Sequence, residues 1–526
     1  MALYLGIDCS TQGLTAIVIE VQGDTRRVVF DQSLSFDRDF PEYGTTGGVN
    51  RGATDDEVHA SPLMWASALD RMMARLARTA EIDLERLRAI SGSAQQHGSV
   101  FLNSFALEAW RMLDPSIALA PQLKDTFARQ ESPVWMDATT SQQCREIEDA
   151  LGGAEAVRSL TGSPACERFT GPQIRKFFQQ QPVDYAATSR IHLVSSFLAS
   201  LLAGVDAPID PGDGSGMNLM DLASNRWAPD ALEATAPLLS EHLPPIRASW
   251  EIFGTLSSYW QKRYSLPPAA MVPWTGDNPS SLIGTGIVHE GVLAVSLGTS
   301  DTVFTCTAEP ARGSSHIFRS PTGDFMNLAC FRNGSLAREW MRLEYQLDWD
   351  AISRLLEKTP GNEGRLMLPW LERETTPLVE HAGLRRFGFD DSDPGHNVRG
   401  LIEGQMMAIA NHAAEITSAP IERVIATGGA AANRAILQVM ANVFGVDVYR
   451  LDTENSAALG AALRAYHADR LAAGEPVSWK TAVSGITEPK SGYRVTPNPK
   501  YVAMYAELRK DYATLERLHA NQRPIC

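Results

Sequence analysis

The same strand–turn–strand pattern occurs twice in this chain, and the repeat constrains the fold more than any other feature. Residues 3–19 read LYLGIDCSTQGLTAIVI, and residues 292–306 read VLAVSLGTSDTVFTC. Each copy is an aliphatic run, a turn of small hydroxyl-bearing residues and a second aliphatic run, which predicts a β-hairpin. Aligned turn on turn, Asp8 of the first copy lies opposite Leu297 of the second. We therefore expect the chain to start its fold twice, with a carboxylate on the strand of the first copy only.

The length and the charge of the chain limit the class of protein. At 526 residues the chain exceeds one ordinary hydrophobic core, so two or more domains are expected. Because the second copy of the repeat starts near residue 291, we place the domains at 1–288 and 289–526. The net charge of −15 argues against nucleic acid as the main partner, because a phosphate backbone needs a basic surface. A small anionic ligand held by a local group of N–H donors stays compatible with this charge.

The cysteines and the apolar runs indicate the compartment. None of the six cysteines forms a C-x-x-C pair, which favours free thiols in a reducing compartment over disulfides or a zinc site. No apolar run approaches 18 residues, so no membrane span is expected. The N-terminal apolar run is broken by Asp8 and is interpreted as a strand, not a signal peptide. We expect a cytoplasmic protein without a membrane partner. The sequence does not determine the oligomeric state, and a homodimer is one alternative.

A carboxylate and a turn rich in hydroxyl groups follow the first predicted strand. Asp8 ends the strand, and residues 9–13 (CSTQG) form the turn, with small side chains and available backbone N–H groups. One interpretation is a turn that contacts phosphate, with Asp8 beside a metal ion. The alternative is an ordinary hairpin turn, for which these residue types are also typical.

Three further polar clusters in the first domain are candidate ligand sites. His97 lies in the segment QQHG at the end of a short predicted strand, where ligands collect in open α/β sheets. Arg168 stands beside an aromatic residue in ERFTG and could offer a planar donor fork to a polyol or phosphate oxygen. Asp277 and Asn278 lie on a tight turn, TGDNP. The alternatives are a structurally satisfied histidine and a surface arginine. The glycine-rich segment 210–217 is expected to be a plain loop.

A strand, a double glycine and a helix follow one another in the second domain. The strand is predicted at 421–427, GGAAAN follows at 428–433, and a helix continues to Phe444. Free N–H groups and the helix dipole make such a junction a ready site for an anion or a nucleotide phosphate. The small-residue helix at 455–466 is expected to pack close to this loop. A charged helix in the tail, 495–523, is expected to be peripheral.

Together these segments resemble the FGGY carbohydrate kinases. The resemblance rests on GIDCST, QQHG, TGDNP, SLGTSD and ATGGAAANR, and it runs from residue 1 to about residue 520. It implies an α/β fold of two ribonuclease-H-like (actin-like ATPase) lobes with a catalytic cleft between them. Within the family, FDRDFPEYGTTGG, SGSAQQHGS, PVWMD, ERFTG, DGSGMN, TGDNP and NGSL resemble the members that phosphorylate D-xylulose. Any one motif is moderately specific, whereas seven in order are highly specific.

The resemblance also implies which residues form the site. The implied sugar contacts are His97, Arg168, Asp277 and Asn278, with Asp277 as the catalytic base. The implied nucleotide contacts are Trp349, Gly429, Ala430 and Asn433. From the turns themselves we add phosphate contacts at Asp8, Thr11, Gly298, Thr299 and Gly428, with Asp8 on the metal side. Many family members have Gly-Thr after the equivalent carboxylate, whereas this chain has Cys9-Ser10-Thr11. Which turn hydroxyl contacts the transferred phosphate therefore stays open.

The implied reaction is transfer of a phosphoryl group from ATP to D-xylulose with Mg²⁺, which depends on positioning and charge neutralisation. Asp277 is expected to accept the proton of the attacking hydroxyl, and an ordinary aspartate pKa near 4 leaves it ionised at neutral pH. Asp8 is expected to act on Mg²⁺ through water, and Thr299 to steady the transferred charge. The partners are thus a sugar and ATP. The alternatives are a kinase for ribulose, gluconate or glycerol, or an actin-like ATPase that is not a sugar kinase.

Overall fold

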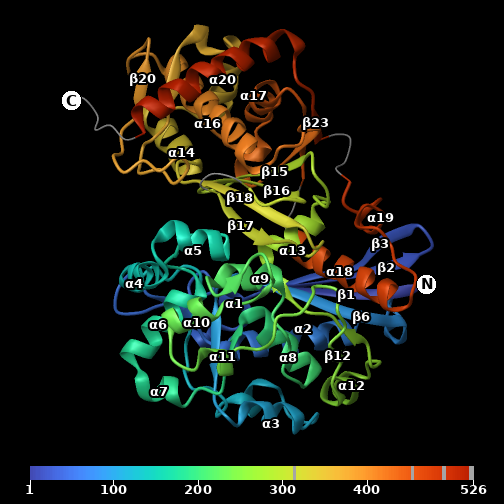
Figure 1. Cartoon of the computed structure of the whole chain (residues 1–526). Coiled ribbons are helices and arrows are strands. Elements are labelled where there is room, and N and C mark those ends of the chain that lie inside the picture. The colour runs from blue at the N-terminus through green and yellow to red at the C-terminus, as the bar shows by residue number, and fades with distance from the viewer. Residues whose placement is uncertain (312–314, 452–454, 489–492, 521–526) are drawn as a thin grey trace. The chain divides into compact units, whose positions relative to one another are not determined.

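A computed structural model describes residues 1–311, 315–451, 455–488 and 493–520 (Figure 1). The chain forms two compact units. The first comprises Met1–Val288, Phe318–Asp324 and Asn455–Thr487. The second comprises His289–Ile317, Phe325–Glu454 and Glu488–Cys526. Each unit is built on a mixed β-sheet with helices packed against it, so the predicted α/β class is confirmed.

The sheet of the first unit contains both predicted strands of the first hairpin. Its strand order is β12-β13-β6-β1-β2-β3, and β14 also pairs with β6. The bounds are β1 Ala2–Cys9, β2 Gly13–Gln22, β3 Thr25–Ser35, β6 Leu87–Ala94, β12 Gly254–Thr255, β13 Ala270–Met271 and β14 Thr275–Gly276. Strand β2 is antiparallel to β1, and β3 is antiparallel to β2. In contrast, β6 runs parallel to β1, and β13 and β14 run parallel to β6.

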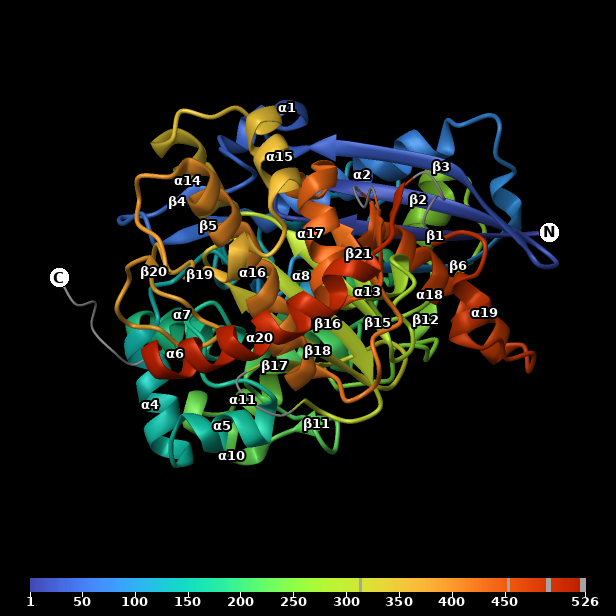
Figure 2. The same cartoon turned by 90° about the horizontal axis from the view of Figure 1, so that it is seen from above.

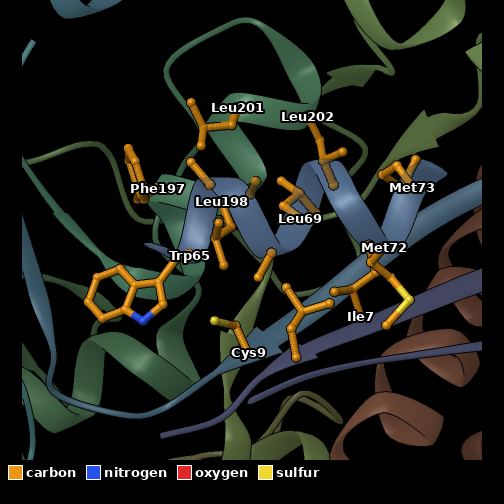
Figure 3. Packing of buried hydrophobic residues seen from close by; sticks show 14 of the residues in the cluster. Ile7, Cys9, Trp65, Leu69, Met72, Met73, Phe197, Leu198, Leu201 and Leu202 are labelled. Atoms are coloured by element: carbon orange, nitrogen blue, oxygen red, sulfur yellow. The ribbon is translucent and has the colours of Figure 1, made fainter. Parts of the chain in front are cut away.

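Alternation along β1 sorts its side chains between two layers of helices. Leu3, Leu5, Ile7 and Cys9 are fully buried in the cluster that also contains α2 (Pro62–Ala77) and α8 (Val194–Ala203). Figure 3 shows Ile7 and Cys9 of the strand beneath the aliphatic and sulfur side chains of these helices. Tyr4 belongs to a different cluster, formed with α18 (Ser456–Ala472). Because successive residues of a strand point to opposite faces, a single strand joins both layers.

Helix α18 packs against the first unit's sheet and against α13 (Asp277–Gly284). The backbones approach so closely that a Cβ placed on Gly284 would overlap the carbonyl oxygen of Ser456, and one on Gly460 would overlap that of Ser280. Only glycine permits such an approach. The small residues of the helix expected at 455–466 serve contacts with α13 and β1, and its packing near the loop at 428–433 stays a prediction.

The sheet of the second unit repeats the arrangement of the first. Its order is β17-β18-β16-β15-β21-β22-β23. The bounds are β15 Val292–Leu297, β16 Asp301–Thr307, β17 His316–Arg319, β18 Phe325–Phe331, β21 Arg423–Thr427, β22 Asp447–Arg450 and β23 Arg494–Val495. As with β1, β15 is antiparallel to the next strand of its hairpin and parallel to β21, which is parallel to β22. The predicted duplication of the hairpin is confirmed.

The register of the two hairpins corrects the alignment of their turns. The last paired residues before the turns are Cys9 with Leu14 and Leu297 with Asp301. Matching the strand ends thus places Cys9 opposite Leu297, whereas the motif alignment placed Asp8 there. The reason is that the first turn is longer by one residue.

Helices α16 (Pro394–Ile416), α17 (Arg434–Phe444) and α20 (Pro499–His519) pack against one another in the second unit (Figure 2). Tyr505 and Tyr512 of α20 are fully buried, and the Tyr505 hydroxyl donates to Glu403 Oε1 at 2.6 Å. The tail helix is therefore part of the second core and not peripheral. Most of the charged residues that suggested a peripheral helix are exposed, whereas Glu516 is buried against α16.

The other helices and strands divide between the two units. In the first unit they are α1 (Phe36–Asp39), α3 (Ala106–Arg111), α4 (Ser141–Leu151), α5 (Ala154–Thr161), α6 (Thr170–Gln180), α7 (Pro182–Ala186), α9 (Pro211–Gly214), α10 (Pro229–Thr235), α11 (Leu239–His242), α12 (Ser258–Tyr264), α19 (Trp479–Val483), β4 (Asn50–Arg51), β5 (Val58–Ala60), β7 (Ser99–Leu102), β8 (Ser132–Pro133), β9 (Arg190–Leu193), β10 (Met220–Asp221) and β11 (Arg226–Trp227). In the second unit they are α14 (Ser335–Glu344), α15 (Trp349–Lys358), β19 (Leu366–Leu368) and β20 (Arg385–Phe387). None of the helices in the described ranges has the length and apolar character to cross a bilayer. The five cysteines in these ranges are free thiols, and Cys526 lies outside them.

His412 links α16 to α20 and makes the stability of the second unit depend on pH. Its Nε2 lies 3.1 Å from Glu516 Oε2, and its Nδ1 lies 3.3 Å from Glu415 Oε1. Burial alone would lower the pKa of His412, but the two carboxylates outweigh it and raise the pKa to about 9. A histidine whose pKa is higher in the folded protein than in the unfolded chain stabilises the fold. This stabilisation is fully present below the unfolded-state pKa near 6.5 and is lost as the pH rises through the folded-state pKa of about 9.

We expect the free energy of unfolding to fall by up to about 3 kcal/mol between pH 6.5 and pH 9.5 through this group, at 1.36 kcal/mol per pKa unit. Urea unfolding at several pH values, followed in wild type and in His412→Gln, measures it. The variant should lack this component of the pH dependence. Parallel curves for the two proteins over that range would contradict the assignment to His412.

Candidate functional site

The carboxyl ends of three parallel strands bring Asp8 and the Asp277 segment to one edge of the first unit's sheet. Asp8 of β1 pairs in register with Ser93 of β6, and Ser93 pairs with Thr275 of β14. Asp277 begins α13 two residues after Thr275. The parallel register, which the motif spacing alone does not contain, therefore sets both carboxylates beside the end of β6.

Asp8 is buried, and each oxygen of its carboxylate accepts a hydrogen bond. Ser93 Oγ donates to Asp8 Oδ1 at 2.7 Å, and Ser10 Oγ donates to Oδ2. Burial raises the pKa of Asp8, and the two hydroxyl donors oppose that rise. In the same turn, Thr11 Oγ1 accepts from Trp135 Nε1 at 2.8 Å. Ser10 is thus the turn hydroxyl beside the carboxylate, and Thr11 is tied to a tryptophan.

Asp277 is the first residue of a helix and not part of a tight turn. The sequence prediction of a turn is wrong, because Gly276 is the N-cap of α13 and Asp277 is its first helical residue. Asn278 N donates to Asp277 Oδ1 at 2.8 Å, and Asn278 Nδ2 donates to Gln96 Oε1 at 2.9 Å. The residue is partly exposed, and it makes no ion pair with any residue that the structure describes. Its carboxylate is therefore available to a ligand.

The pKa of Asp277 departs from the ordinary value expected from sequence. Although the residue is partly exposed, the loss of water around its carboxylate is the largest cause, and the negative charge of Asp8 adds to it. The hydrogen bond from Asn278 N acts in the opposite direction. The net result raises the pKa of Asp277 to about 7. A carboxylate tuned to this range can both accept and release a proton near neutral pH.

Two distant segments meet around His97. His97 adopts a left-handed conformation, with φ of 72°, and its ring stacks on Phe169 with 4.3 Å between centroids. Its Nδ1 lies 2.8 Å from the carbonyl oxygen of Gly216, which requires Nδ1 to be the donor. Thr170 Oγ1 donates to the His97 carbonyl at 3.0 Å. Arg168 precedes Phe169, is partly exposed and makes no hydrogen bond or ion pair within the described ranges.

Two features of this cluster were missed from sequence. The segment 210–217 is not a plain loop, because it forms α9 and a short 3₁₀ helix and is buried throughout. Gln96 was not among the candidate residues, although it joins the His97 turn to Asn278. The signal for Gln96 was its place in QQHG, whereas nothing in the sequence indicates that Gly216 contacts His97.

In the second unit, Gly428 joins the predicted nucleotide loop to the second hairpin. Its φ is 84°, and a Cβ at this position would lie 2.6 Å from the Leu297 carbonyl oxygen. Both the left-handed conformation and the close approach require glycine. The loop 428–433 therefore lies against the end of β15, next to the turn that carries Gly298 and Thr299.

Four of the predicted nucleotide residues line one cavity of about 620 Å³ in the second unit. Asn433 caps α17 by accepting from Ala435 N at 2.9 Å, and its Nδ2 donates to Ser353 Oγ at 2.9 Å. Trp349 is 40% exposed at the start of α15. The volume is that of a small-molecule site. The lining residues are Ser335, Trp349, Asp350, Ser353, Glu357, Gly429, Ala430, Ala432, Asn433, Arg434 and Ala435.

The turn with Gly298 and Thr299 is fixed to α14. Ser335 N donates to the Gly298 carbonyl at 2.8 Å. Asp301, which follows the turn, accepts from both Nη atoms of Arg338 at 2.8 Å each. Since Ser335 also lines the cavity, the turn lies close to it. The structure thus brings together Gly298, Gly428 and the cavity residues of the second unit.

A metal ion has one candidate ligand among the predicted residues. Within the described ranges no group of three or more histidine, cysteine, aspartate or glutamate side chains is arranged to hold a metal. Mg²⁺ is commonly held by one or two carboxylates, water and substrate phosphates, so a single carboxylate fits this ion. Asp8 is that carboxylate, and hydroxyl groups already orient both of its oxygens.

Comparisons with known proteins match most of the chain. The model of the N-terminal domain of the FGGY family of carbohydrate kinases matches residues 129–284, and that of the C-terminal domain matches residues 293–468. A mouse protein named xylulose kinase is 41% identical over 99% of this chain and 95% of its own length. A protein of Arabidopsis thaliana named xylulose kinase 2 is also 41% identical, over 89% of this chain and 87% of its own.

Solved structures match over the whole length. A xylulose kinase from Rhodospirillum rubrum has a TM-score of 0.81 at 20% identity, and each chain is covered to 98%. A glycerol kinase from Plasmodium falciparum, solved with ADP, has a TM-score of 0.78 at 15% identity, with 99% of each chain covered. At these identities the likeness shows the fold. It confirms the predicted class of two mixed-sheet lobes of the actin-like ATPase type.

Proposed function

This chain belongs to the FGGY family of carbohydrate kinases, and we propose that it transfers the terminal phosphoryl group of ATP to D-xylulose, giving D-xylulose 5-phosphate. The observation that carries the proposal is the 41% identity to a mouse xylulose kinase over nearly the whole length of both chains. The proposed domains are 1–288 for the sugar and 289–526 for the nucleotide. The family models at 129–284 and 293–468 support this division.

In the proposed reaction Asp277 accepts the proton of the attacking sugar hydroxyl. Its carboxylate is available, and a pKa of about 7 matches a general base that works near neutral pH. Asn278, held by Gln96, binds the sugar beside the base. Phe169 and Gly216 fix the orientation of the His97 ring, and its Nε2 is proposed to contact a sugar hydroxyl. Arg168 supplies charged donors.

The nucleotide is proposed to bind in the cavity of the second unit. Trp349 and Ala430 offer apolar contact to the base, and Asn433 offers hydrogen bonding. Gly429 and the start of α17 offer backbone N–H groups to phosphate oxygens. Gly298, Thr299 and Gly428 complete the phosphate contacts of this unit, and Asp8 and Thr11 add those of the first hairpin.

We further propose that Asp8 holds Mg²⁺ through water. The ion would neutralise charge on the phosphates during transfer. Asp8 is suited to this role because Ser10 and Ser93 orient both carboxylate oxygens and leave lone pairs for water ligands.

A panel of sugars in a coupled assay of ADP release tests the proposal. D-xylulose should give the highest kcat/KM, above ribulose, gluconate and glycerol. Preference for another polyol would assign the chain to a different substrate of the family, as for the structurally similar gluconate kinase of Lactobacillus acidophilus. ADP release that no sugar stimulates would favour an actin-like ATPase without sugar kinase activity.

The pKa of Asp277 leads to an expected pH profile. A base must be deprotonated to act, so kcat/KM should fall tenfold per pH unit below about pH 7. Because the charge of Asp8 contributes to the raised pKa, Asp8→Asn should move this limb to lower pH, whatever it does to the maximal rate. Rates measured from pH 5 to pH 9 test both points. A limb near pH 4 in wild type would show that Asp277 is an ordinary carboxylate.

A further inference from the structure

Arg464 of α18 is a buried cation, and its hydrogen bonds within the described residues go to the segments that carry the site of the first unit. The residue is 1% exposed. Its Nη1 donates to the carbonyl oxygen of Gly92 at 3.0 Å, and its Nη2 donates to that of Pro273 at 2.6 Å. Gly92 is in β6, two residues before its end, and Pro273 precedes β14. One guanidinium group therefore joins two neighbouring chain segments.

The segment between Pro273 and Gly276 is held by further tethers. Ser91 Oγ donates to the same Pro273 carbonyl at 3.1 Å. Trp274 is fully buried so close to Gly92 that a Cβ there would overlap the indole ring. Thr275 Oγ1 donates to Asp210 Oδ1. Asp277 follows this tethered segment directly, so its position depends on these contacts.

Asp210 completes the cluster and faces Arg464. Its Oδ2 lies 3.9 Å from Arg464 Nη2, and its Oδ1 also accepts from Asp213 N at 3.1 Å. The Asp213 carboxyl group lies nearby, where burial raises its pKa and the charge of Arg464 opposes that rise. Burying a cation costs free energy unless the cation is paired and hydrogen-bonded. An apolar side chain could fill the same space without that cost, so the guanidinium group is expected to serve the contacts that it makes.

We propose that Arg464 is a positioning residue for phosphoryl transfer, which holds the strand end before Asp277 so that the base has one fixed place. The proposal rests on the proposed function. A planar guanidinium fork can reach two carbonyl oxygens on different segments, whereas an ammonium group acts as a point charge. The residue lies 187 positions after Asp277, and the close packing of α18 on α13 gives it a rigid base.

The experiment compares Arg464→Met, Arg464→Lys and Thr275→Val with wild type. Arg399→Met is the matched control, because Arg399 is also 1% exposed and paired, with Glu403 in the second unit. For each protein the folded fraction is measured by near-UV circular dichroism, and kcat is expressed per folded molecule. KM values for D-xylulose and ATP are measured separately.

We expect Arg464→Met to lower kcat per folded molecule by about 10- to 100-fold, since a misplacement of about 1 Å can cost 10²-fold. The KM for ATP should stay within about twofold, because the nucleotide cavity is in the other unit. Arg464→Lys should restore part of kcat. Thr275→Val keeps the shape of the side chain but removes the hydrogen bond to Asp210, and it should also lower kcat. Arg399→Met should lower the melting temperature and leave kcat per folded molecule unchanged.

Two failures can be told apart. If wild type releases no ADP in response to any sugar, the proposed function is wrong. If wild type is active and Arg464→Met and Thr275→Val both keep wild-type kcat per folded molecule, the positioning role is wrong and Arg464 serves stability alone. Should Arg464→Met fail to fold, Thr275→Val and Arg464→Lys decide the matter by the same criterion.

Discussion

Replacing Asp277 by alanine is expected to lower kcat for ATP-dependent phosphorylation of D-xylulose by about 10²–10⁴-fold, the range of general base catalysis. The carboxylate begins α13, is not used in an ion pair within the described ranges and has a pKa of about 7. Asp8, the other carboxylate at this edge of the sheet, already accepts hydrogen bonds from Ser10 and Ser93. A coupled assay of ADP release at saturating sugar and ATP measures the loss.

Asp277→Asn distinguishes loss of the proton acceptor from loss of side-chain volume. It keeps the size of the side chain but removes the proton acceptor, so its kcat should fall as far as that of the alanine variant. Asp230→Ala, at an exposed aspartate in the first turn of α10, is the matched control and should keep wild-type kcat. Near wild-type turnover in both Asp277 variants would refute the base assignment. The KM for ATP should be unchanged in all three.

The hairpins and the strand ends were predictable because their signals are local. Alternating aliphatic residues and small turn residues define β1–β2 and β15–β16 without reference to the rest of the chain. The glycine pair after β21 was predictable for the same reason, since a strand, Gly428 and a helix start follow one another directly. In motifs of this kind the residue types themselves determine the local backbone conformation.

Contacts between distant segments were not predictable. The small residues of α18 are compatible with close packing on any partner, and only the fold selects α13, through Gly284 and Gly460. The role of Gly216 beside His97 depends on a separation of 119 residues, which no local pattern encodes. The pKa of Asp277 likewise depends on burial and on Asp8, which the parallel register of β1, β6 and β14 brings near.

Removing the carboxylate of Asp301 is expected to destabilise the second unit by about 3–5 kcal/mol, because it leaves a buried cation without its partner. Asp301 is 1% exposed, and its two oxygens accept from Arg338, which is fully buried. Arg338 also donates to Gln405 of α16 at 2.9 Å. The pair therefore joins β16, α14 and α16 in one network. Hydrogen exchange of the amides in β16 and α14, measured in Asp301→Ala, reports the loss of stability of this unit.

The same change should raise the KM for ATP, because the turn of Gly298 and Thr299 ends at Asp301 and depends on α14 for its position. A second substitution distinguishes an unpaired charge from lost packing. Adding Arg338→Met to Asp301→Ala removes the stranded cation and should recover part of the stability, since apolar replacements of buried pairs are often neutral. The solvent-accessible pair Glu339–Arg342 on the same helix is the control, and Glu339→Ala should cost much less than Asp301→Ala. If Asp301→Ala costs no more than this control, the ion pair does not hold the turn, and Thr299 must be positioned by the backbone bond between Ser335 and Gly298.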